Sequence, residues 1–104
     1  MSLDVRFSAA AEDDLARLFD FLLDRAETLE DLALAQDAIK AVRTTALNQL
    51  TTTPYSFRKA GKSPTRRELI IPFGVSGYVA LYEIASLSSV VVLALRHQCE
   101  EDYH

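Results

Sequence analysis

The sequence predicts an α+β domain in which a helical hairpin packs on one face of an antiparallel sheet. Two observations lead to this fold class. Between Ser8 and Pro54, two successive runs carry apolar side chains at helical spacing, whereas residues 66–97 contain three β-rich runs separated by short turns. The expected order of elements is β-α-α-β-β-β. The chain has 104 residues, which suits one domain over residues 1–104 with a modest core.

The first expected element is a strand over residues 3–7, where apolar and charged residues alternate, so that one face is buried. Ser8 follows as a good N-cap, and acidic residues occupy the opening turns of the helix that comes next. The apolar stripe of this helix recurs at helical spacing and comprises Ala11, Leu15, Leu18, Phe19, Leu22, Leu23 and Ala26.

A second helix is expected from Thr28, with Asp31 three residues later in a capping-box arrangement. It should end near Thr53 and Pro54, because β-branched residues weaken a helix and the residue before a proline favours extended geometry. A tight connection at Glu27 makes the two helices a hairpin. Both apolar stripes are interpreted as core rather than as sites. The second stripe comprises Leu32, Ala35, Ile39, Val42, Ala46 and Leu50.

Residues 54–65 are expected to be irregular, since they contain two prolines and a glycine. Three strands should follow, over residues 66–74, 76–84 and 90–97, and pair as an antiparallel meander. Pro72 lacks a backbone N–H, so its strand should be irregular at that position or turn it outward. These strands and the segment before them contain most of the residues that can do chemistry.

The charge of the chain is unevenly distributed. Its net charge is -4, yet residues 58–67 contain five cations and no acid. An acidic chain with one basic segment does not suit a general nucleic-acid coat, but the segment can grip a local acidic target. The alternative is a solvated segment that keeps the neighbouring strand edge soluble. The expected partner-binding residues are Arg58, Lys59, Lys62, Arg66, Arg67 and Arg96.

No membrane or targeting segment stands out in the sequence. No apolar run approaches the roughly 20 residues of a membrane span, and residues 1–6 lack the layout of a signal peptide. We therefore expect a cytoplasmic protein without a membrane partner. The single Cys99 cannot form an internal disulfide, which agrees with a reducing compartment. Neither a metal nor another cofactor is expected, because His97, Cys99 and His104 lack the paired spacing of metal ligands.

Acid–base cleavage of RNA is the enzymatic alternative. It needs a base for the 2′-hydroxyl proton, cations around the scissile phosphate and an acid for the leaving oxygen. Neighbouring strand positions face opposite sides, so Arg66 and Arg67 cannot both face one site. Arg96 has an alternative role in pairing with Glu68 or Glu83 across the sheet. The candidates for this catalysis are Arg67, Arg96, His97 and Tyr103.

Segments spread over nearly the whole chain follow one another in a characteristic order and spacing. They are the helix start at residues 8–15, Leu50 with Pro54, then residues 67–69, 72–74, 77–82 and 92–98. Each segment is a weak signal alone, but together they resemble the RelE/ParE superfamily of toxins from bacterial type II toxin–antitoxin systems. The resemblance implies the same α+β fold that the periodicity predicts.

The superfamily divides by target. Its ribonuclease members resemble one another in having an arginine just after the Gly-Tyr of the central hairpin, and basic residues with a tyrosine after the last strand. This chain has Val79 at the first of these positions. After His97 it has Glu100, Glu101 and Asp102, and an acidic tail repels a phosphate backbone. The resemblance therefore favours the ParE-like branch, whose members bind and poison DNA gyrase.

The function that this resemblance implies is that of a plasmid-stabilisation toxin neutralised by a cognate antitoxin. In the favoured interpretation the protein binds DNA gyrase and is not an enzyme. The first alternative is a RelE-like endonuclease that cleaves mRNA at the ribosome. The second alternative is a binding module of the same fold that is not toxic.

Overall fold

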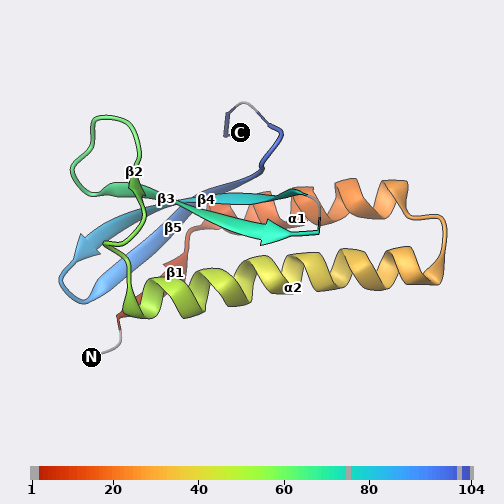
Figure 1. Cartoon of the computed structure of the whole chain (residues 1–104), viewed down its shortest axis with the longest axis horizontal. Helices are drawn as coiled ribbons and strands as arrows, with labels where there is room; N and C mark the ends of the chain where they lie inside the picture. The colour runs from red at the N-terminus through yellow and green to blue at the C-terminus, as the bar shows by residue number, and fades with distance from the viewer. Residues whose placement is uncertain (1–2, 75, 101, 104) are drawn as a thin grey trace.

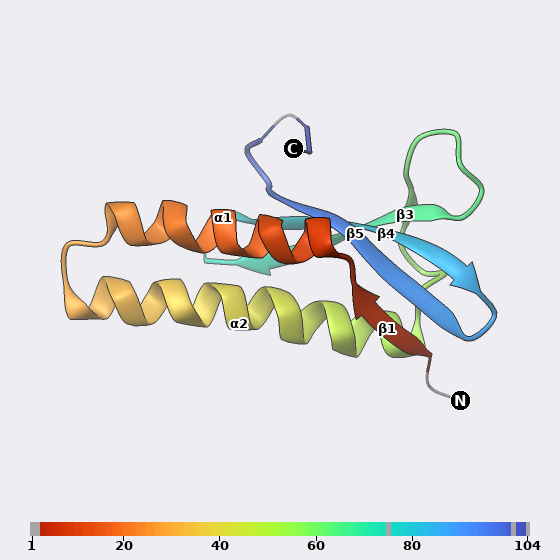
Figure 2. The ribbon, with the colours of Figure 1, turned by 180° about the vertical axis from the view of Figure 1, so that it is seen from behind.

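The two helices lie side by side along one face of a twisted sheet (Figures 1 and 2). The computed structural model describes residues 3–74, 76–100 and 102–103. Within these residues the chain forms two helices and five strands in the order β-α-α-β-β-β-β. The predicted α+β fold class, with a helical hairpin on one face of the sheet, is confirmed.

Capping side chains define the helical hairpin. Helix α1 (Ala9–Arg25) begins where the Ser8 hydroxyl accepts a hydrogen bond from the Ala11 N–H at 3.1 Å. Helix α2 (Leu29–Thr52) begins where the Thr28 hydroxyl accepts from the Asp31 N–H at 3.0 Å. The Asp31 carboxylate in turn accepts from the Glu27 N–H at 3.0 Å. This reciprocal pair is the predicted capping arrangement.

The strands form one open sheet in the order β1-β5-β4-β3-β2. The predicted antiparallel meander is present in β3, β4 and β5. The sheet as a whole is mixed, because β1 pairs with β5 in parallel; the long connection between these two strands contains both helices and strands β2, β3 and β4. The strands are β1 (Asp4–Phe7), β2 (Arg58–Lys59), β3 (Arg66–Phe73), β4 (Ser76–Ser86) and β5 (Ser89–His97).

Strand β2 lies inside the segment that was expected to be irregular. Its two residues pair antiparallel with Glu68 and Arg67 of β3. The Ala60 N–H donates to the Arg66 carbonyl at 2.9 Å, so the even-numbered residues of β3 direct their backbone groups toward β2 and the outer edge. Pro72 is one of these residues, which places its missing donor at the edge, as predicted.

The core lies between the helices and the face of the sheet that they cover. Its largest fully buried side chain is Tyr82, whose hydroxyl donates to the Pro54 carbonyl, and burial raises the pKa of this phenol to about 12. The interpretation of the helical stripes as core is correct near the sheet, where Leu18 and Val42 are buried. It is wrong at the far end of the hairpin, where Leu32 is 39% exposed because the helices extend past the strands.

Candidate partner-binding face

Strand alternation divides the polar side chains between the two faces of the sheet. In β3, Leu69 and Ile71 are buried against the helices, so Glu68 and Ile70 point to the other side. We call this other side the open face. Among the described strand residues, those on the open face include Arg66, Glu68, Ile70, Val79, Leu81, Glu83 and Arg96.

Tyr103 fastens the C-terminal tail to the open face. Its hydroxyl donates a hydrogen bond of 2.5 Å to Glu68 Oε2, and the Arg96 guanidinium lies 5.2 Å from its ring centroid. Glu68 also accepts from Arg58 Nε at 2.9 Å. Burial, reinforced by the hydrogen bond to the Glu68 carboxylate, raises the pKa of the Tyr103 phenol well above its usual range. Tyr103 is therefore a protonated donor at neutral pH.

The basic segment lies beside this tyrosine. Lys59, Arg66, Glu68 and Tyr103 line a cavity of about 300 Å³. Arg66 pairs with Glu83 at 3.4 Å, whereas neither Lys59 nor Lys62, which lies in the following loop, forms an ion pair with any described residue. Three of the predicted partner-binding residues thus gather at the open face, Arg58, Arg66 and Arg96, and Lys59 lines the cavity beside them.

Arg67 is separated from this group because its side chain points to the helix side of the sheet. Its Nη1 donates to the Phe57 carbonyl at 2.7 Å, and its guanidinium lies 6.0 Å from the Tyr55 ring centroid. The same charge lies close enough to Tyr82 to oppose the rise in the pKa of that phenol. Arg67 therefore holds the connection between α2 and β2 against the sheet.

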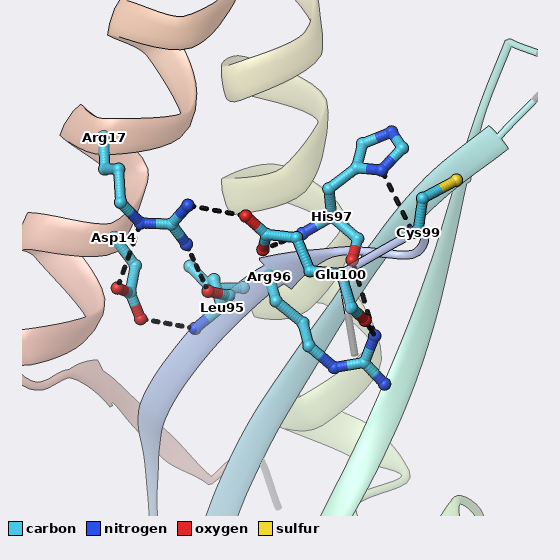
Figure 3. A network of polar contacts seen from close by, with 7 residues as sticks. All are labelled: Asp14, Arg17, Leu95, Arg96, His97, Cys99 and Glu100. Atoms are coloured by element: carbon cyan, nitrogen blue, oxygen red, sulfur yellow. Dashed lines mark hydrogen bonds and ion pairs between the residues drawn. The ribbon is translucent and has the colours of Figure 1, made fainter. Parts of the chain in front are cut away.

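His97 also lies on the helix side. Its ring packs edge-on against Tyr78, with 5.4 Å between the ring centroids, and its Nε2 lies 3.1 Å from the Ser76 hydroxyl. Nδ1 accepts the Cys99 N–H at 3.1 Å, so in this arrangement Nδ1 carries no proton and Nε2 is the donor to Ser76 (Figure 3). The side chain of Arg96, one residue earlier, points away from His97.

A cluster of polar contacts, which the sequence did not reveal, connects α1 with β5 and the tail. Strand β1 ends at Phe7, opposite Val92, so beyond that point β5 has β4 on one side and no strand on the other. The Asp14 carboxylate accepts the Leu95 N–H at 2.8 Å, and Arg17 donates to the Leu95 carbonyl at 3.3 Å (Figure 3). Asp14 is buried, and the sequence does contain a signal for it, because Asp14 falls on the apolar face of its helix beside Leu15.

Glu100 completes this cluster from the tail. One of its carboxylate oxygens accepts from Arg17 at 2.8 Å, and the other accepts the His97 N–H at 3.0 Å. Its backbone carbonyl accepts from Arg96 Nη1 at 2.7 Å. Glu100, which was expected only as a repelling charge, therefore positions the tail. Glu101 and His104 lie outside the described residues.

Two further features bear on the kind of site. Neither of the two helices, which lie wholly within the described residues, is both long and apolar enough to cross a membrane. In the same part of the chain, no three His, Cys, Asp or Glu side chains come together as metal ligands. The polar side chains described on the open face of the sheet are mainly arginines and carboxylates, together with Tyr103.

Comparison with known proteins identifies the family. The family described as the ParE toxin of the type II toxin–antitoxin system, parDE, matches residues 5–102. The chain belongs to this family. It is also 36% identical to Toxin RelE1 of Caulobacter vibrioides over 101 residues, which are 97% of this chain and 99% of that protein. The predicted membership of the RelE/ParE superfamily is therefore confirmed, and the chain is a toxin of a type II toxin–antitoxin system.

Two solved structures share the fold of this ParE family member. The chromosomal ParDE system from P. aeruginosa contains a chain that matches with a TM-score of 0.70 and 13% identity, over 92% of this chain and 96% of that one. The RelBE2 toxin–antitoxin complex from Mycobacterium tuberculosis matches with a TM-score of 0.62 and 19% identity, over 96% and 95%. One of these structures is named ParDE and the other RelBE, so this chain shares its fold with structures that carry the names of both branches.

Proposed function

We propose that this toxin acts by binding its cellular target, as ParE-like toxins do, and that it does not cleave RNA. The observation that carries this proposal is the division of the ribonuclease candidates. Arg67 and His97 lie on the helix side of the sheet, whereas Arg96 and Tyr103 lie on the open face. A base, an acid and phosphate-binding cations must act on one scissile bond, so residues on opposite faces cannot share the reaction.

The open face also lacks the electrostatics of a phosphate site at its centre. Val79, which stands where ribonuclease members carry an arginine, is buried there. The Glu68 carboxylate lies between Arg58 and Tyr103 and accepts from both. A carboxylate at this point repels a scissile phosphate. The Tyr103 hydroxyl already donates its hydrogen bond to this carboxylate, so it does not offer that proton to a leaving oxygen. DNA gyrase is the proposed target, because the chain matches the ParE family and ParE-like toxins act on gyrase by binding rather than by catalysis.

We further propose that a cognate antitoxin neutralises the toxin by placing an acidic and apolar segment on the open face. The exposed cations Lys59 and Lys62 have no ion-pair partner among the described residues, and the ion-pair partner of Arg66 is the half-buried Glu83 at 3.4 Å. Ile70 adds exposed apolar surface to the open face. The two solved structures compared above both come from toxin–antitoxin systems. An antitoxin segment that is disordered when free can order on such a surface.

The discriminating experiment is induced expression of the toxin, followed by two assays in parallel. Growth arrest, inhibition of supercoiling by purified gyrase and intact cellular mRNA are the expected results. Rescue of growth by co-expressed antitoxin tests the second part of the proposal. Normal growth together with retained antitoxin binding would instead identify a binding module that is not toxic.

A RelE-like endonuclease is the second candidate. It is favoured by the relative named RelE1 and by the stacking of Arg96 on Tyr103 beside the basic segment. Mapping of mRNA ends after induction tests it. Codon-specific cleavage that disappears in Arg96→Ala, Arg67→Ala or His97→Ala would replace the binding proposal with this one.

A further inference from the structure

Exposed apolar side chains gather at the end of the helical hairpin that lies farthest from β1. We call residues 20–34 the hairpin tip; it projects beyond the strands at the right of Figure 1 and the left of Figure 2. Phe21 is 48% exposed and Leu34 is 57% exposed. Of the eight large hydrophobic residues that are exposed in the described chain, half belong to the hairpin tip: Phe21, Leu29, Leu32 and Leu34. Such a concentration on a small protein marks an interaction surface.

The hairpin tip overhangs two adjoining cavities. One, of about 390 Å³, lies between the last turn of α1, the first turns of α2 and the turn between β3 and β4, and Leu34 lines it. The other, of about 300 Å³, lies between α1 and the tail, and Phe21 lines it. Leu22, Tyr78 and His97 line both cavities. We call the two cavities together the tip groove, and its lining is mainly apolar.

Carboxylates surround the tip groove. Residues 20–31 contain five acids and one arginine, a net charge of -4. None of these five acids forms an ion pair with a described residue, although the Asp31 carboxylate accepts a hydrogen bond from the Glu27 N–H. The one cation, Arg25, packs its guanidinium 3.8 Å from the Phe21 ring centroid. The tip groove is therefore an apolar recess with a negative rim.

We propose that the tip groove binds a basic amphipathic helix of a partner protein. Apolar side chains of that helix would fill the two cavities, while its lysines and arginines would face the unpaired carboxylates of the rim. A helix fits better than an added strand, because the lining consists of side chains from α1, α2 and the sheet rather than of a free strand edge. The surface and its charge both differ from those of the basic open face, so this binding is additional to the proposed antitoxin contact there.

A second copy of this chain does not match the chemistry of the tip groove. Its basic segment, residues 58–67, forms a short strand, a loop and the start of β3. Its two helices, which lie within the described residues, each carry more acids than bases. The occupant is therefore a different, basic chain.

The experiment uses the full-length toxin and two synthetic amphipathic peptides of about 18 residues, or five helical turns. Both have leucines on one face; one has lysines and the other glutamates on the opposite face. Fluorescence anisotropy is expected to show binding of the lysine peptide alone, more tightly at low salt. Leu34→Glu should weaken this binding by about tenfold or more, because it places a charge in the apolar recess. Leu87→Glu is the matched control, since Leu87 is 91% exposed in the turn between β4 and β5.

The rim is tested by charge reversal. Asp24→Lys together with Glu30→Lys should weaken binding of the lysine peptide, whereas Asp13→Lys, at the other end of α1, should leave it unchanged. Equal binding of the two peptides, or equal effects of the Leu34 and Leu87 variants, would overturn the proposal. Self-association of the toxin that Leu34→Glu abolishes would also overturn it, by assigning the tip groove to a second copy. None of these results depends on toxicity or on the antitoxin.

Discussion

The Asp14 carboxylate in the second turn of α1 accepts the backbone N–H of Leu95 near the end of β5, at 2.8 Å. The contact replaces a strand. Once β1 has ended, the Leu95 amide would otherwise be a buried donor without an acceptor, and such groups are costly. A single side chain thus lets β5 continue beyond its parallel neighbour and carry Arg96 and His97 to their positions.

Replacement of Asp14 should destabilise the fold. Asp14→Ala leaves the Leu95 N–H without its acceptor and removes the carboxylate that lies 3.8 Å from Arg17 Nε, so a loss of about 1–3 kcal/mol in the free energy of unfolding is expected. Chemical denaturation measures it. Asp13→Ala is the control, because Asp13 is the exposed neighbour in the same helix. Equal effects of the two variants would show that the contact with Leu95 contributes nothing.

The cost of core truncation in the hairpin should depend on how deeply the side chain is buried. Leu18→Ala is expected to lower the free energy of unfolding by roughly 2–5 kcal/mol, because Leu18 is buried against the sheet. Ile39→Ala should cost less, since Ile39 is only partly buried. Thermal melting of both variants checks the order. Unchanged melting of Leu18→Ala would mean that α1 is not packed as described.

Charge reversal in the basic segment should weaken antitoxin binding. Arg58→Glu, Lys59→Glu and Lys62→Glu are expected to reduce the affinity, and more strongly at low ionic strength, because exposed charges are screened by salt. Titration calorimetry at two salt concentrations gives the comparison. Lys40→Glu, on the exposed surface of α2, is the matched control. An affinity that does not change at either salt concentration would reduce the segment to a solvated loop.

The stability of the protein should fall in alkaline solution. Burial raises the pKa values of the Tyr82 and Tyr103 phenols in the folded state, the former to about 12, from an ordinary value of 10.0. Because these values are raised on folding, the neutral phenols favour the folded state fully below pH 10. That contribution decreases as the pH rises from 10 through the folded-state pKa values, since only the unfolded chain can readily lose these protons.

Tyr103→Phe tests the contribution of the tail to this pH dependence. The variant should show a shallower loss of stability above pH 10, because one of the shifted phenols is gone. Urea denaturation at a series of pH values provides the slopes. Tyr55→Phe serves as the control, since Tyr55 is exposed in the connection after α2. A Tyr103→Phe slope equal to that of the wild type would place the tail off the sheet in solution.

The local features of the fold follow from the sequence because their causes are local. Ser8 and Thr28 cap helices through bonds to residues three positions later, and the meander follows from alternation and turns. The parallel pairing of β1 with β5 joins segments from opposite ends of the chain, which no local pattern specifies. Strand β2 has only two residues, which are too few to show the alternation of buried and exposed side chains that predicts a strand.

The candidate site was predictable only in part. Alternation along β3 and β5 separates Arg67 from Arg96, because Arg67 lies two positions before the buried Leu69 and so shares its face, whereas Arg96 directly follows the buried Leu95 and so faces the other way. The position of Tyr103 could not be predicted, since the tail has no periodicity and is held by Glu68 and Arg96 from distant strands. The proposed partner contacts on the open face remain predictions.

The side chains that finish the edge of β5 also affect how the protein behaves at high concentration. A bare strand edge is a template on which a second molecule can add its own strand. Here Asp14, Arg17 and Glu100 occupy the donors and acceptors that such a strand would use. A toxin that loses these side chains therefore exposes a new site for aggregation, quite apart from any change in what it binds.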